Sequence, residues 1–109
     1  MRIEEIPFIA ILRGVRPEEV EAIGTALVDA GIRAIEVPLN SPSPIESIAL
    51  LARRFGAAAL VGAGTVLDLA SVAAVADAGG QLIVAPNTDR TVIAAAAGRG
   101  LITPPGYLT

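Results

Sequence analysis

The sequence contains no cysteine and no histidine, and its eight basic residues are all arginines, so lysine is absent as well. The lack of cysteine excludes disulfide bonds and thiol nucleophiles, and the lack of histidine removes the usual zinc ligands. Aromatic residues are scarce, since only Phe8, Phe55 and Tyr107 are present. A core of this chain therefore has to be built from small aliphatic side chains, as in parallel strands buried under helices.

The charge pattern also excludes several classes of function. The net charge is −3 and no basic stripe occurs, which argues against a nucleic-acid partner. The beginning of the chain is acidic and is interrupted at Pro7, so it lacks the basic start and the long apolar stretch of a signal peptide. The apolar runs fall short of the ~20 residues that a membrane helix needs. We therefore expect a cytoplasmic protein without a membrane segment.

The 109 residues, 53% of them apolar, are enough for one domain, which we place over residues 1–109. Short apolar runs alternate with longer segments of helical spacing. The short runs predict five strands, over residues 7–12, 34–39, 59–62, 82–85 and 101–103. The segments between them predict four helices, which begin at Pro17, at Pro44 after Ser43, at Thr65 or Asp68, and at Asn87 or Thr88.

Local signals support these helix boundaries. Pro17 suits a first helical position, and Glu18 and Glu19 favour the positive end of the helix dipole. Ser43-Pro44-Ile45-Glu46 has the form of a capping box. Asp-Ala-Gly closes two helices, at residues 29–31 and 77–79. Repeated strand–helix units with short connections predict right-handed crossovers and a parallel sheet.

Two architectures fit this alternation, an open doubly wound sheet and a (β/α) barrel. The glycine fingerprint that follows the first strand of a dinucleotide-binding domain is missing. Polar residues recur instead where strands end, namely Arg13, Glu36, Asn40, Thr65 and Asn87. Active sites of (β/α) barrels are built at that rim. A complete barrel has eight strands in typically ~250 residues, so the sequence predicts either an incomplete barrel or an open structure that must cover its exposed sheet edge.

Five segments at the predicted strand ends together resemble a known family. They are Ile11-Leu12-Arg13-Gly14, Glu36-Val37-Pro38-Leu39-Asn40-Ser41-Pro42, Gly62-Ala63-Gly64-Thr65-Val66, Ala85-Pro86-Asn87 and Pro105-Gly106. In this order they are similar to the 2-keto-3-deoxy-6-phosphogluconate / 2-keto-3-deoxy-6-phosphogalactonate aldolase family. The resemblance covers essentially the whole chain and about half of a family member, the N-terminal part of a (β/α)8 barrel.

The resemblance implies a class I aldolase, usually a homotrimer, that needs no cofactor and no metal ion. Such an enzyme cleaves a keto-deoxy-phospho sugar acid to pyruvate and glyceraldehyde 3-phosphate. A lysine amine forms a Schiff base with the keto carbon, and this imine serves as the electron sink for carbon–carbon cleavage. A glutamate transfers the protons. By its place in the motifs, Glu36 resembles that glutamate.

Four further residues resemble family substrate-binding positions. Arg13 resembles the arginine that holds the substrate carboxylate, and Thr65 the residue that binds the pyruvate end. Pro86 resembles a pocket-wall proline. Asn40 lies in Pro-Leu-Asn-Ser-Pro, which resembles the galactonate branch of the family, whereas the gluconate branch carries Thr-Leu-Arg at this place.

The residue types alone allow plainer roles for each of these positions. Glu36 follows apolar residues, where desolvation would raise its pKa toward neutrality, but a strand-end glutamate can also face water. Arg13 can pair with Glu18 or Glu36 instead of binding a carboxylate. Thr65 can be a helix N-cap, and Pro86 can simply end a strand.

The resemblance also predicts what the chain does not contain. The Schiff-base lysine of the family lies on the next strand, beyond residue 109, and no lysine occurs in the chain. The chain alone is therefore expected to be inactive and to associate, either with further copies or with a missing C-terminal half. Two alternatives stay open, a self-associating half-barrel without catalysis and a remnant that binds keto acids. A sugar-phosphate epimerase is disfavoured because histidine is absent.

Overall fold

The computed structural model describes residues 8–66, 68–84 and 90–103. Strands and helices alternate along the chain in the order β1 (Ala10–Ile11), α1 (Pro17–Asp29), β2 (Ala34–Pro38), α2 (Pro44–Phe55), β3 (Leu60–Gly64), α3 (Leu69–Asp77), β4 (Leu82–Val84) and α4 (Arg90–Gly98). This is the α/β alternation that the sequence predicts. None of the helices in the described ranges is long and apolar enough to cross a membrane.

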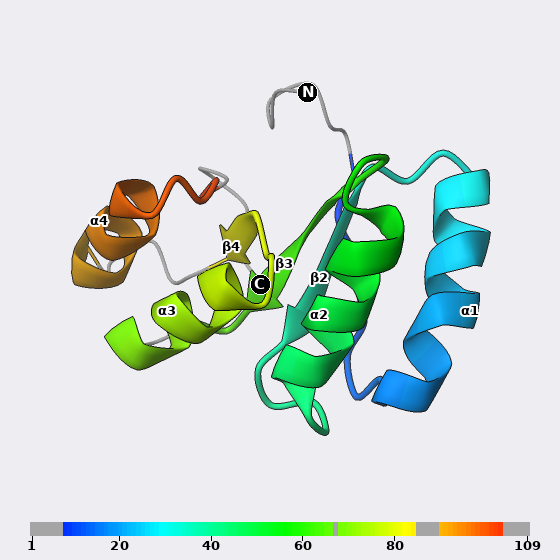
Figure 1. Cartoon of the computed structure of the whole chain (residues 1–109), viewed down its shortest axis with the longest axis horizontal. Coiled ribbons are helices and arrows are strands. Elements are labelled where there is room, and N and C mark those ends of the chain that lie inside the picture. Colours follow the sequence, from blue (N-terminus) through cyan, green and yellow to red (C-terminus); the bar gives the residue numbers. More distant parts are fainter. Residues whose placement is uncertain (1–7, 67, 85–89, 104–109) are drawn as a thin grey trace.

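The strands form one parallel sheet in the order β1-β2-β3-β4, so each strand lies beside its predecessor in the chain (Figure 1). The fifth predicted strand, over 101–103, is reduced to one parallel bridge between Leu82 and Ile102. Ile83 N–H donates to Ile102 O at 2.9 Å, and Ile102 N–H donates to Gln81 O at 2.8 Å. Within the described residues the predicted fifth strand is thus present only as this bridge, which lies beside β4 at the expected place.

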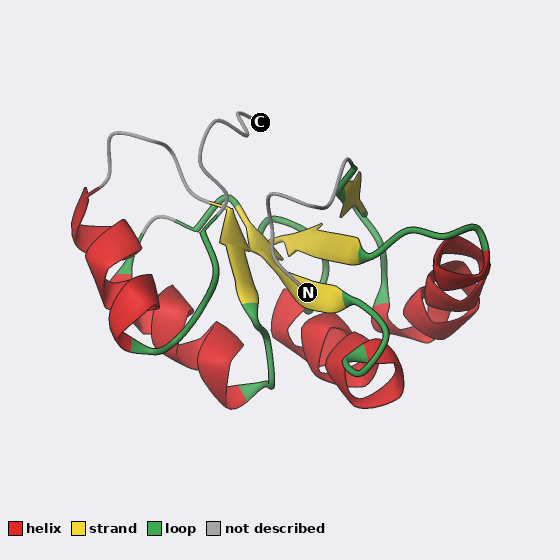
Figure 2. Cartoon of the chain, turned by 90° about the horizontal axis from the view of Figure 1, so that it is seen from above, coloured by secondary structure: helices red, strands yellow, loops and turns green. Residues whose placement is uncertain are grey.

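The helices lie along one side of the sheet only (Figure 2). Because neighbouring strand residues point to opposite faces, the sheet has two distinct apolar clusters. The cluster under the helices includes Ile35, Val37, Val61 and Ile83, which are 0% exposed. The other face, here called the open face, carries Ala34, Leu60, Leu82 and Val84, with Ile9 and Ile102 packed beside them. The sheet thus separates a helix-covered side from a side without helices.

Helix beginnings follow the sequence signals in two cases and depart from them in one. At α1, the N–H of Arg16 donates to Glu19 Oε1 at 2.9 Å, and Pro17 is the first helical residue. At α3, Asp68 is the N-cap, and its Oδ1 accepts the Ser71 N–H at 2.7 Å. At α2, Ser43 occupies the N-cap with φ +42° and its side chain makes no cap hydrogen bond. The predicted capping box at Ser43 was therefore wrong, because the left-handed backbone there does not present the hydroxyl to the helix.

Strand boundaries differ from the prediction by a few residues. The first strand, predicted over 7–12, is only Ala10–Ile11, with Pro7 outside the described residues. β3 begins one residue later than predicted and continues to Gly64, so the Gly-Ala-Gly run belongs to the strand itself. The predicted beginning of α4 at Asn87 or Thr88 also lies outside the described residues.

Candidate active site

The carboxyl ends of three strands are linked in register by backbone hydrogen bonds. Leu12 N–H donates to Glu36 O at 3.0 Å, and Leu39 N–H donates to Gly64 O at 3.0 Å. These bonds bring the loops after β1, β2 and β3 to the same edge of the sheet. Of the polar residues that the sequence singled out at strand ends, those in the described ranges therefore lie at one rim, where parallel (β/α) folds bind ligands, whereas Asn87 lies outside the described residues.

Glu36 is the ionisable side chain that β2 contributes to the open face. It follows Ala34 by two residues and so points to the same side. Its residue is only 1% exposed, and Oε2 has no hydrogen-bond partner among the described residues. The other residues of the four strands are apolar, glycine or proline. Among the strand residues, Glu36 is therefore the single carboxyl group in an otherwise apolar, buried environment.

Burial determines the acidity of this carboxyl group. Desolvation raises the pKa of Glu36 from 4.5 to about 7, and the positive charge of Arg13 opposes that rise. A carboxyl group with a pKa near 7 is present in both protonation states at neutral pH. It can therefore donate and accept protons there, as general acid–base catalysis requires.

Gly64 provides the space that the Glu36 carboxyl group occupies. A β-carbon on Gly64 would overlap both carboxyl oxygens of Glu36 and its Cδ atom. The two residues lie on adjacent strands, where Glu36 pairs with Gly62 and Pro38 pairs with Gly64. The carboxyl group thus extends along the sheet toward the carboxyl end of β3, and only glycine at 64 permits this position.

Arg13 lies in the loop after β1 and is exposed. The described residues contain no ion pair between Arg13 and either Glu18 or Glu36. Its influence on Glu36 is electrostatic and acts without direct contact. The predicted pairing of Arg13 is therefore not formed, and the guanidinium group is available to an anionic ligand at this rim.

Thr65 follows β3 directly and has a left-handed backbone, with φ +57°. Such a conformation is uncommon for a β-branched residue and is often found at functional sites. The alternative role of Thr65 as a helix N-cap was wrong, since Asp68 caps α3. Asn40 is exposed in the loop between β2 and α2. Pro86 lies outside the described residues.

Ser41 is a rim residue that sequence reasoning did not single out. It is 5% exposed, and its Oγ accepts the N–H of Gly14 at 3.1 Å. The bond joins the loop after β1 to the loop after β2 across 27 positions of sequence. No local pattern predicts a contact of this length, and the one available signal was that Ser41 lies inside the Asn40 motif.

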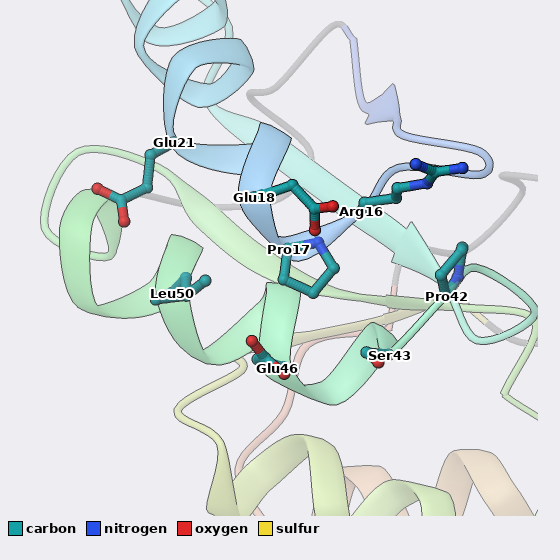
Figure 3. A pocket seen from close by; sticks show the side chains of 8 residues that line it. All are labelled: Arg16, Pro17, Glu18, Glu21, Pro42, Ser43, Glu46 and Leu50. Carbon is teal, nitrogen blue, oxygen red and sulfur yellow. The ribbon is translucent and has the colours of Figure 1, made fainter.

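A separate groove of about 660 Å³ lies on the helix side of the molecule (Figure 3). It is lined by Arg16, Pro17, Glu18, Glu21, Pro42, Ser43, Glu46 and Leu50. None of the four predicted site residues in the described ranges, which are Arg13, Glu36, Asn40 and Thr65, lines it. The groove runs between the beginnings of α1 and α2, whereas Glu36 lies on the open face, so the two are different places.

Comparison with known proteins decides the family. The family model described as KDPG and KHG aldolase matches residues 1–109. The chain belongs to this family. The "Probable 2-dehydro-3-deoxy-6-phosphogalactonate aldolase" of Rhizobium meliloti (strain 1021) is 50% identical over 105 residues, which are 96% of this chain and 50% of that protein. The 2-dehydro-3-deoxy-6-phosphogalactonate aldolase of Escherichia coli (strain K12) is 48% identical, over 96% of this chain and 51% of its own length.

Solved structures agree with the sequence comparisons. A native KDPGal structure superposes with a TM-score of 0.89 at 48% identity, over 96% of this chain and 51% of that chain. The KDPG aldolase of Legionella pneumophila, captured with pyruvate as a covalent carbinolamine, superposes with a TM-score of 0.81 at 28% identity. The superposition covers 95% of this chain and 50% of that chain. The predicted family and fold class, the N-terminal part of a (β/α)8 barrel, are thereby confirmed. The chain spans about half the length of the curated relatives it matches.

Proposed function

We propose that this chain supplies the proton-transfer part of a class I aldolase active site. In this proposal Glu36 moves protons at the substrate, Arg13 binds the substrate carboxylate, and Thr65 binds the pyruvate end. Asn40 and Pro86 contribute to the walls of the substrate pocket. The observation that carries the proposal is Glu36, a buried carboxyl group without a hydrogen-bond partner in the described residues and with a pKa of about 7.

The proposed reaction cleaves 2-dehydro-3-deoxy-6-phosphogalactonate to pyruvate and glyceraldehyde 3-phosphate. Identity of 48–50% to relatives named for the galactonate substrate supports this choice. The gluconate aldolase of Treponema pallidum is 33% identical. We therefore propose the galactonate-type substrate over the gluconate type.

The proposal assigns activity to a complete active site and not to these 109 residues alone. The sequence has no lysine to form the Schiff base. Reduction with borohydride in the presence of pyruvate should therefore leave the mass of the chain unchanged. A stable adduct of pyruvate on the chain would contradict the predicted incompleteness.

A chimera tests the role of Glu36 directly. Residues 1–109 would replace the matching half of the Escherichia coli relative, which supplies the remaining half of the protein. We expect aldolase activity in the chimera, a preference for the galactonate substrate, and a loss of kcat of at least ~100-fold on Glu36→Gln. Glu46→Gln is the matched control, because Glu46 is an exposed glutamate on α2. A folded chimera that keeps full activity after Glu36→Gln would overturn the proposal.

Self-association without catalysis is a second candidate, favoured by one observation. β1 pairs only with β2 among the described residues, and apolar side chains stand beside this open edge, Phe8 being 69% and Ile11 43% exposed. An exposed apolar edge strand favours pairing with another chain. Sedimentation of the 109-residue chain and of Ile11→Lys tests this. A monomer at high concentration for both would remove the candidate.

A further inference from the structure

The hydrogen bond between Ser41 and Gly14 assigns a function to a residue outside the proposed catalytic set. We propose that Ser41 is a positioning residue: by accepting the Gly14 N–H, it holds the loop after β1 so that Arg13 stays within electrostatic range of Glu36. This inference rests on the proposed function of Glu36 and Arg13. It adds a residue that acts on the site through the backbone of a neighbouring loop.

Ser41 is itself held firmly. Its backbone N–H donates to Pro38 O at 3.0 Å, which attaches the residue to the end of β2. Pro38 and Glu36 belong to the same strand. The Ser41 hydroxyl group is buried and its Oγ is within hydrogen-bond distance of Gly14 N, at 3.1 Å. The strand that carries Glu36 thus also carries the acceptor that fixes the next loop.

The loop on the other side of the bond needs such an anchor. Gly14 has φ +75°, a left-handed conformation that glycine adopts readily, and a β-carbon there would meet nothing within 4 Å. The conformation, rather than lack of space, therefore requires glycine. Arg13, which precedes it, is exposed and forms no ion pair with the described residues. The place of Arg13 consequently depends on the backbone of the loop.

The electrostatic effect of Arg13 on Glu36 makes the inference measurable. Among the charged groups of the described residues, Arg13 is the one that lowers the pKa of Glu36 against the rise caused by burial. Other ionisable side chains are absent from the open face of strands β1 to β4. If Ser41 holds Arg13 in place, loss of the Ser41 hydroxyl group weakens this interaction.

The experiment is a double-mutant cycle on the 109-residue chain, read by the carboxyl ¹³C titration of Glu36. The chain carries ¹³C-labelled glutamate, and Glu36→Gln assigns the resonance. We expect Ser41→Ala and Arg13→Gln each to raise the pKa of Glu36, by about half a pH unit for a screened charge near a surface. The double variant should show no further rise over Arg13→Gln alone, because Ser41 acts through Arg13.

Two further variants separate positioning from general destabilisation. Ser41→Thr retains a hydroxyl group and should leave the Glu36 titration unchanged. Ser47→Ala is the matched control, since Ser47 is fully buried and its Oγ has no hydrogen-bond partner among the described residues. Should Ser41→Ala reduce the helical circular dichroism, Ser41→Cys keeps the side-chain volume while providing only a weak acceptor.

The outcomes are distinct. An unchanged Glu36 titration in Ser41→Ala or Ser41→Cys overturns the inference, and so does an equal rise in the Arg13→Gln background. The titration observes Glu36 directly, so it is independent of catalysis. An inactive chimera would contradict the proposed function, whereas additive effects in the cycle would contradict only the role of Ser41.

Discussion

The carboxyl group of Glu36 lies against the Cα of Gly64 on the neighbouring strand, in the space that a β-carbon would fill. The absence of a side chain at Gly64 on β3 therefore leaves room for the buried Glu36 side chain of β2. This relationship explains why a glutamate can lie on an apolar face of the sheet without a partner group. A substitution of Gly64 on β3 can therefore test the environment of Glu36 on β2.

Gly64→Ala should displace the Glu36 carboxyl group. We expect the free energy of unfolding to fall by about 1–3 kcal/mol, as for overpacking of a core. We also expect the pKa of Glu36 to decrease from about 7 toward 4.5 as the group moves toward water. Urea unfolding and the carboxyl ¹³C titration measure both effects.

Gly98→Ala is the control for that substitution. Gly98 is the last residue of α4, and a β-carbon there would meet nothing within 4 Å. Because alanine favours a helix over glycine, this variant should be neutral or slightly more stable. Equal losses for the two variants would show that the Gly64 site is not special.

Glu36 should make the stability of the chain depend on pH above its unfolded-state pKa. The folded-state pKa of about 7 exceeds the ordinary value of 4.5, so the folded state binds the proton more tightly. This contribution to stability is complete below pH 4.5 and is lost as the pH rises through 7. The loss amounts to about 3 kcal/mol.

Glu36→Gln should remove this dependence. The variant is expected to be more stable than the original chain at pH 8 and to show little difference between pH 5 and pH 8. Urea unfolding at these two values measures it, with Glu18→Gln, an exposed glutamate of α1, as the control. A Glu36→Gln variant that is less stable than the original chain at pH 8 would contradict the buried, unpartnered carboxyl group.

Asp68 should stabilise the chain at neutral pH and lose this effect in acid, whereas the contribution of Glu36 is lost as the pH rises. The backbone N–H of Ser71 lowers the pKa of Asp68 below its usual value of 3.8. The stabilisation is therefore present above pH 3.8 and is lost as the pH falls through the lowered folded-state value. At pH 7, Asp68→Ala should lower the urea midpoint, whereas Asp68→Asn, which keeps an oxygen acceptor, should lower it less. Equal midpoints for the two variants would contradict the capping role.

Thr65→Asn tests whether the left-handed backbone at Thr65 is needed for substrate binding. Asparagine tolerates a left-handed backbone better than threonine, so the variant should raise the free energy of unfolding by up to about 1 kcal/mol. The same change in the chimera should weaken substrate binding, seen as a higher KM. Thr25→Asn is the control, because Thr25 lies inside α1 and its hydroxyl donates to Glu21 O at 2.9 Å. More stability together with unaltered catalysis would separate the strain from the active site.

The alternation of strands and helices could be predicted because each element has a local signal. Pro17 marks the first helix, and the apolar run at 34–39 marks a buried strand, as the structure confirms. The prediction was wrong at Ser43, since the capping box is a pattern of residue types whereas the cap depends on φ. The fifth predicted strand is present in the described residues as a single parallel bridge to β4.

The candidate site could be predicted only in part, for the same reason. Glu36 was recognisable because an acid inside an apolar run is conspicuous, and the family motif pointed to it. The space above Gly64 and the bond from Gly14 to Ser41 could not be derived from the residues. Both join positions that are far apart in sequence and adjacent in the sheet, and such contacts leave no periodic pattern.

The two faces of β2 divide its residues into separate sets with separate constraints. Ile35 and Val37 pack beneath the helices, while Ala34 and Glu36 belong to the open face. Insertion of a single residue between Ala34 and Ile35 would exchange these sets and turn the Glu36 carboxyl group into the helix-covered core. A substitution in this strand therefore alters one face of the sheet, whereas an insertion alters both faces. The place of Glu36 at the rim therefore depends on which residues of the five-residue strand β2 face each side of the sheet.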